Sequence, residues 1–251
     1  QGKRLGLNIG SMVGQDSTPL EAKAKGEQAE YNGHYEKHMY KAHVTTDLVH
    51  DIPLGECTTP GLDYDGHFLQ CNLQKVKACG AGVKDVYGDQ HYGTYRNYAF
   101  VECELGARVH FRLAVDNEYN SAGELGELRR VYQTYWRNAD FKANADDNEV
   151  ARFLYAHGEA ERVGALYRNH AVQEREECPD GFAESLYPRT KCEGLNGHWK
   201  EQLDFERSFK KKGLVNAEVH VSATCFAVLL VVLTRLQHGV TMGLARLAGL
   251  S

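Results

Sequence analysis

The sequence lacks the short motifs that usually identify an enzyme. It contains no GxSxG nucleophile elbow, no GxxxxGK(S/T) phosphate loop, no GxGxxG dinucleotide turn and no HExxH zinc motif. It also contains no CxxC pair, which excludes the usual spacings of zinc ribbons and thioredoxin-like redox sites. The motifs therefore predict no catalytic residue and no cofactor.

The chain also lacks an excess of positive charge. Lys and Arg number 29 against 34 Asp and Glu, and the net charge is -5. A protein that binds nucleic acid usually carries a basic patch, so we expect no nucleic acid among the partners. In other respects the composition is that of an ordinary folded protein, because 42% of the residues are hydrophobic and 25% are charged.

Signals for β-strands are few, whereas signals for helices are frequent. Capping residues precede apolar periodic stretches at Thr18, Thr94 and Asp146. The first of these, followed by Pro19, predicts a helix that runs to about Ala42. We therefore expect a mainly α fold.

One stretch of that expected helix is rich in His and Tyr and carries candidate metal ligands. Glu30, His34 and His38 recur every four residues and would share one face of a helix. Two His at this spacing can hold a metal, with the carboxylate as a third ligand. The alternative is a solvated or partner-facing stripe, and no fourth ligand stands at a recognisable spacing, so we assign no metal.

A long uncharged stretch lies near the C-terminus. Residues 219–234 contain no Asp, Glu, Lys or Arg, and Arg235 then stands alone. A transmembrane helix needs about 20 apolar residues, so we expect a membrane-spanning or membrane-docked helix. Gly239 and Gly243 form a GxxxG step, and with Arg235 they predict docking against another helix in lipid. The alternative is a buried core helix.

These features divide the chain into three parts. We expect an extended N-terminal arm at 1–16, a helical soluble body at 17–213 and the apolar C-terminal helix at 214–251.

Six of the seven cysteines lie in the expected soluble body, and the seventh, Cys225, lies in the apolar stretch. An even number suits a disulfide framework in an oxidising compartment, and the alternative is free thiols buried in a core. The expected helical hairpin places Cys71 opposite Cys103, and Cys178 and Cys192 flank a short segment, so we expect these two pairs. Cys57 and Cys79 would then pair by elimination.

A helical body stapled by cysteines, with one membrane helix, resembles an accessory subunit of a mitochondrial inner-membrane complex of the respiratory chain or ATP synthase. The region 57–115 is similar in kind to the twin-cysteine helical hairpins of that compartment, although its cysteine gaps of thirteen, seven and twenty-three residues depart from their pattern.

The resemblance implies a non-catalytic structural or assembly subunit. Its partners would be other subunits and the lipid bilayer, and its body would face the intermembrane space. Two alternatives stay open: a soluble secreted disulfide-bonded binding protein, and a metal-dependent enzyme that uses Glu30, His34 and His38.

Overall fold

The structure is a computed structural model that describes residues 7–22, 28–205, 209–210 and 212–246. It divides into two compact units. The first unit combines residues 1–83 with residues 188–251, and the second comprises residues 84–187. The two are described in turn.

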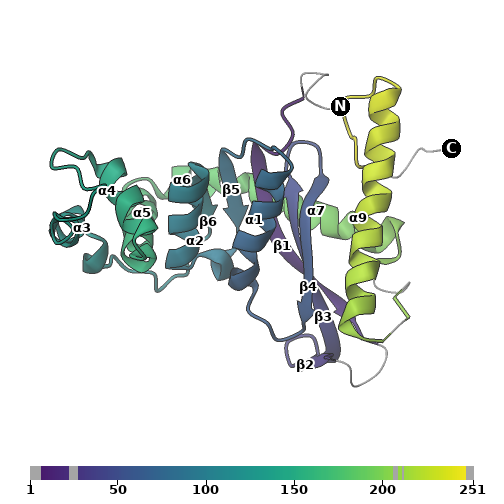
Figure 1. Ribbon diagram of the computed structural model, residues 1–251. Helices are drawn as coiled ribbons and strands as arrows, with labels where there is room; N and C mark the ends of the chain where they lie inside the picture. Colours follow the sequence, from purple (N-terminus) through teal and green to yellow (C-terminus); the bar gives the residue numbers. More distant parts are fainter. Residues whose placement is uncertain (1–6, 23–27, 206–208, 211, 247–251) are drawn as a thin grey trace. The chain divides into compact units, whose positions relative to one another are not determined.

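The first unit is built on an antiparallel sheet (Figure 1). Its strands are β1 (Met12–Glu21), β2 (Glu30–Asn32), β3 (Lys37–Asp47) and β4 (Ile52–Pro60). The central strand is β3, which pairs with each of the other three. In its register with β1, Gln15 lies opposite Thr45 and Asp16 lies opposite Val44.

Helices cover both faces of this sheet. On one face lies α1 (Leu69–Ala78), which follows the short 3-10 helix η2 (Asp65–Phe68). Asn72 of α1 reaches the sheet there, because its side-chain amide donates to the His43 carbonyl at 3.0 Å.

The other face of the sheet is covered by α7 (Thr190–Gln202) and by α9 (Leu214–Gln237), drawn in yellow in Figure 1. Successive side chains of a strand point to opposite faces, so the apolar positions of β1 and β3 gather on this second side. They form one core with residues of α7, α9 and the segments between them: Leu20, Tyr40, Ala42, Val44, Trp199, Phe205, Phe209, Val221, Val228 and Val232.

The apolar helix α9 is thus a sheet-covering helix. By length and composition alone it is apolar enough to cross a membrane, but the core helix of a soluble protein passes the same test. Val221, Val228 and Val232 are buried against the sheet, whereas Phe226 and Leu230 on the other side are exposed. The alternative of a core helix agrees with this packing.

The residues expected to dock a second helix in lipid lie at and beyond the end of α9. Gly239 and Gly243 have φ values of +75° and +59°, in the left-handed region that ends a helix. Arg235 donates a hydrogen bond to the Gly243 carbonyl and so holds the turn that follows. A GxxxG contact needs both glycines on one helix, and here neither is on α9.

The second unit is mostly helical and carries a parallel strand pair. Its strands β5 (Asp85–Gly88) and β6 (Arg108–Phe111) are joined through the 3-10 helix η3 (Gln90–Tyr92), α2 (Tyr95–Ala99) and a π-helical segment (Phe100–Leu105). The remaining elements are η5 (Ser121–Gly123), α3 (Leu125–Gln133), α4 (Asp147–Ala156), α5 (Ala160–Glu177) and α6 (Pro179–Ser185). The 3-10 helix η6 (Tyr187–Arg189) spans the boundary at which the chain returns to the first unit.

Local helix signals in this unit are confirmed. The Thr94 side chain accepts the Asn97 N–H at the start of α2, and Asp146 with Glu149 forms a capping box at the start of α4. Such caps depend on residues three positions apart, so they are readable from the sequence.

The predicted mainly α class is wrong, because the structure is 50% helical and 18% strand. Thr18 and Pro19 lie in β1, not at the start of a helix. Local capping propensity there is overridden by pairing with β3, a contact with residues more than twenty positions away. The predicted division of the chain at residues 16 and 213 stays a prediction, although Met12 to Asp16 already belong to β1.

The predicted disulfides are also wrong. All seven cysteines are free thiols. Cys71 lies near Cys57, with 4.0 Å between the sulfur atoms, and not in a hairpin with Cys103. Cys57 lies on strand β4, whereas the prediction assumed a continuous helical hairpin.

Candidate acidic site on strand β1

A carboxylate stands in the middle of β1. Asp16 is partly exposed, although the residues before it, Val13 to Gln15, are buried. Its Oδ2 accepts a hydrogen bond from Nδ2 of Asn196 at 2.8 Å, and its Oδ1 accepts the Ser17 N–H at 2.9 Å. The carboxylate is therefore fixed between its own strand and helix α7.

Helix α7 lies unusually close to β1. A Cβ atom added at Gly14 would come within 2.3 Å of Sγ of Cys192, so this position has room only for glycine. The close approach brings the first half of α7 over Asp16. Glu193 precedes Asn196 by three residues, and residues at this spacing share one face of a helix.

Cys192, the residue before Glu193, is a buried thiol whose pKa responds to both carboxylates. The pKa of Cys192 is raised to about 12, chiefly by burial, and the negative charges of Asp16 and Glu193 add to this effect. The Glu193 carboxylate is itself exposed and pairs with Arg189 at 3.1 Å. Glu193 is thus a second carboxylate on the N-terminal half of α7, the helix whose Asn196 bonds Asp16.

The opposite face of β1 is tied to the sheet by a buried polar network. Ser17 donates to Oδ2 of Asp65 at 2.9 Å, and Lys41 reaches Oδ1 of the same carboxylate at 2.9 Å. This network holds the strand segment around Asp16 from behind.

His43 lies behind the same network and is completely buried. The Thr59 hydroxyl donates to the Pro60 carbonyl at 3.1 Å, so it accepts from Nε2–H of His43 at 2.9 Å. Burial lowers the pKa of His43 from 6.5 to about 4, with Lys41 acting in the same direction and Asp65 opposing it. The imidazole is therefore neutral at physiological pH.

The second unit carries an aspartate directly after a buried strand. Asp89 follows β5, and its side chain accepts the His91 N–H at 2.8 Å as it caps η3. Val86 to Gly88, which precede it, are buried, whereas Asp89 itself is partly exposed.

The chemistry of these donors suits a hard divalent cation. Mg²⁺ is held in proteins by one or two carboxylates and keeps several waters, so it does not require a complete cage of side chains. Asp16 and Glu193 supply carboxylates, and Asn196 supplies an amide beside Asp16. Among the described residues, no group of three or more His, Cys, Asp or Glu side chains is clustered closely enough to hold a metal.

The candidates Glu30, His34 and His38 do not share a helix face. Glu30 lies on β2, His38 lies on β3, and His34 lies in the turn between these strands. The Glu30 carboxylate accepts the Leu62 N–H at 2.8 Å, and the His38 ring packs against Tyr31 with 5.4 Å between ring centroids. In a β-hairpin a spacing of four residues does not bring side chains together as it does in a helix.

Sequence reasoning missed Asp16, Glu193 and Asp89. For the two aspartates the available signal was a single carboxylate within an apolar strand or directly after one, whereas Glu193 lies on a helix and had no such signal. That signal was hidden because residues 1–16 were expected to be an arm, and 17–42 a helix.

Comparison with known proteins identifies the family. The family model described as "Transposase DDE domain" matches residues 15–176. No curated protein and no solved structure matches the chain. Asp16 and Asp89 fall within the matched range, and Glu193 lies seventeen residues beyond its end.

This match overturns the interpretation as a mitochondrial accessory subunit. Transposases act on DNA, so the expectations of a non-catalytic structural role, of no nucleic acid and of lipid and membrane subunits as partners are all wrong. The mitochondrial inner-membrane location fails for the same reason. The alternative of a metal-dependent enzyme agrees better with the family than the main interpretation does.

The net charge led to the wrong prediction of no nucleic-acid partner, because it is a sum over the whole chain. Contacts with phosphate depend on local groups. The match extends over well over half of the 251 residues, and the chain belongs to the transposase DDE domain family.

Proposed function

We propose that the chain is a metal-dependent enzyme that breaks and re-forms phosphodiester bonds of DNA. The observation that carries the proposal is the hydrogen bond between Asp16 and Asn196 of α7, because Glu193 stands three residues before Asn196 on the same helix. We take the letters DDE in the family name as two aspartates and one glutamate, because D and E are the one-letter codes of these residues.

Asp16 and Glu193 would hold a divalent cation through their carboxylates. When bound, such an ion stabilises negative charge on a phosphoryl group and makes a bound water a better nucleophile. Each neighbour has a separate task in this arrangement. Asn196 fixes the orientation of Asp16. Gly14 permits the close approach of α7. Arg189 pairs with Glu193 at 3.1 Å and so restricts the position of its carboxylate.

Asp89 is an aspartate of the second unit that we also propose to be required for the reaction. It lies within the matched range, and it directly follows a buried strand. Among the described residues, the Asp89 carboxylate accepts one hydrogen bond, from the His91 N–H at 2.8 Å. The carboxylate therefore retains acceptor capacity for a cation, since an ionised carboxylate has about four lone-pair sites.

Nicking of a supercoiled plasmid in the presence of Mn²⁺ tests the proposal. Asp16→Asn and Glu193→Gln keep size and hydrogen bonding but remove the charge, so each should lower the nicking rate by on the order of 100-fold or more. Glu201→Gln is the matched control, because Glu201 is an exposed residue of the same helix. Its rate should stay at the wild-type value.

The same assay tests Asp89. Asp89→Asn should abolish nicking, whereas Asp116→Asn, an exposed aspartate of the second unit, should leave it unchanged. Full nicking by Asp16→Asn or Glu193→Gln would contradict the proposed function. Full nicking by Asp89→Asn alone would remove only the assignment of Asp89.

A further inference from the structure

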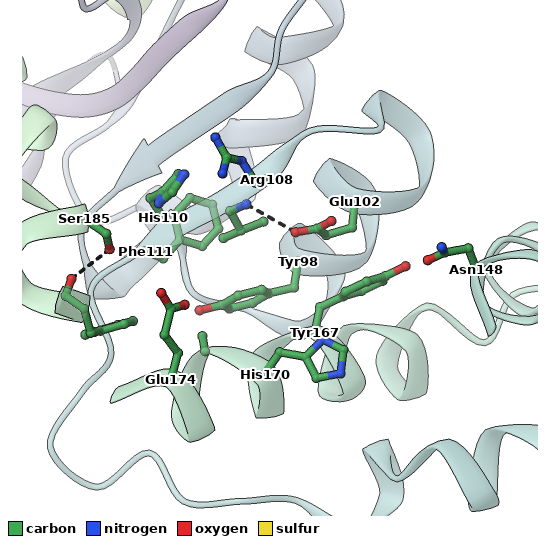
Figure 2. Close-up of a pocket in the computed structure, with 13 residues that line it drawn as sticks. Tyr98, Glu102, Arg108, His110, Phe111, Asn148, Tyr167, His170, Glu174 and Ser185 are labelled. Carbon is green, nitrogen blue, oxygen red and sulfur yellow. Dashed lines mark hydrogen bonds between the residues drawn. The ribbon is translucent and has the colours of Figure 1, made fainter. Parts of the chain in front are cut away.

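The second unit contains a cavity that the proposed chemistry does not use. Its volume is about 330 Å³, and side chains from α2, the π-helical segment, β6, α5 and α6 line it (Figure 2). A water molecule occupies about 30 Å³ of liquid, so the cavity has room for a molecule of about ten non-hydrogen atoms.

A buried hydroxyl without a partner lies in the lining. Tyr98 is 1% exposed, and its hydroxyl makes no hydrogen bond within the described residues. Its ring packs edge-on against Phe111 with 5.4 Å between centroids. Figure 2 shows the hydroxyl directed toward the side of the cavity where the Glu174 carboxylate lies. A buried hydroxyl left unpaired is unfavourable, so a ligand that hydrogen-bonds it would gain affinity from this group.

Two carboxylates line the same space. Glu102 is partly buried, and one of its oxygens accepts the Val109 N–H at 3.3 Å. Burial raises its pKa to about 7. Glu174 is exposed on α5, and its carboxylate has no hydrogen bond or ion pair with another described residue. Arg108, the cationic side chain of the lining, forms an ion pair with Asp85 at 2.8 Å.

The remaining polar groups of the lining also favour a ligand that donates. Burial lowers the pKa of His170, so its ring is neutral at physiological pH and offers one nitrogen as an acceptor. Tyr167 stands beside it with 6.1 Å between ring centroids. Aromatic rings attract cations over their faces, and Tyr98, Tyr167 and Phe111 all belong to the lining.

We propose that this cavity binds the primary ammonium group of a small alkyl amine, with Glu102 and Glu174 as counter-charges and the Tyr98 hydroxyl as a hydrogen-bond acceptor. An ammonium group has three N–H donors and one positive charge, so it can donate to the Tyr98 hydroxyl and to the Glu174 carboxylate on the same side of the cavity (Figure 2). Glu102 adds a second negative charge to the lining. The alkyl part would lie against the aromatic rings.

Calorimetric titration of the full chain with 1,4-diaminobutane tests this site. The expected result is saturable binding of one molecule per chain, with affinity lowered about tenfold by Tyr98→Phe and by Glu102→Gln. Glu176→Gln, an exposed residue of α5 outside the lining, is the control and should bind as the wild type does. Tetramethylammonium carries the charge without N–H donors and should bind at least tenfold more weakly.

Thermal unfolding supplies a second readout that does not depend on any catalytic activity. The diamine should raise the melting temperature of the wild type and of Glu176→Gln, and should raise that of Tyr98→Phe less. The proposal is overturned by absence of saturable binding, by equal affinity in Tyr98→Phe and Glu102→Gln, or by equal affinity for tetramethylammonium.

Discussion

Mild acid should destabilise the fold through His43. The imidazole is fully buried, and folding lowers its pKa from 6.5 to about 4. Between these two values the unfolded chain binds a proton more readily than the folded chain does. The stability that His43 contributes is therefore complete above about pH 6.5 and is lost progressively as the pH falls to about 4.

The size of this effect follows from the pKa difference. A shift of one unit corresponds to about 1.4 kcal/mol, so the drop from pH 7 to pH 4 should cost about 3 kcal/mol through this residue alone. Its neighbours Asp65 and Lys41 partly oppose each other, since the carboxylate raises the pKa of His43 and the ammonium lowers it.

Urea unfolding between pH 4 and pH 7 measures the effect as a difference between variants. His43→Gln cannot titrate in this range, so its stability should fall by about 3 kcal/mol less than that of the wild type. His67→Gln is the control, because His67 is exposed and lies just before Phe68, which stacks on His43. The stability of His67→Gln should change with pH as that of the wild type does.

An NMR titration of the wild-type imidazole checks the same point directly. We expect the His43 resonances to titrate near pH 4. A titration midpoint near 6.5, or identical pH dependence in His43→Gln and the wild type, would refute the reasoning.

Further predictions concern packing within each unit. Gly164→Ala should destabilise the protein by about 3 kcal/mol or more in urea unfolding, because the new Cβ would lie 1.8 Å from the Tyr95 carbonyl oxygen. Gly126→Ala, where nothing lies within 4 Å, should be stabilising by up to about 1 kcal/mol. On α9, Val228→Ala should cost about 2 kcal/mol, because Val228 is 1% exposed, and Leu230→Ala, at 47% exposed, should cost under about 1 kcal/mol. Equal costs on the two sides of α9 would contradict its packing on the sheet.

Elements whose signals are local were predictable from the sequence. The Thr94 cap and the Asp146–Glu149 capping box fix helix starts through residues three positions apart, and both occur as expected. The sheet was not predictable in this way. Thr18 and Pro19 have good helix-start chemistry, but they pair with Ala42 and Lys41 of β3.

The candidate site could not be predicted for a related reason. Asp16 and Asn196 are separated by 180 residues in the chain and meet through a hydrogen bond. Nothing in the local sequence of α7 indicates that its face covers β1, and Gly14, which permits the approach, looks like one glycine in a Gly-rich segment. The apolar pattern of α9 correctly predicted a helix. Hydropathy alone, however, does not show whether the apolar side of a helix packs against lipid or against a β-sheet.

Binding of Mn²⁺, followed by electron paramagnetic resonance without DNA, tests the acidic site most directly. The account predicts that the wild type and Glu201→Gln bind the ion with equal affinity. It also predicts that Asp16→Asn and Glu193→Gln each bind it about 10- to 100-fold more weakly. Wild-type affinity in both Asp16→Asn and Glu193→Gln would contradict the account.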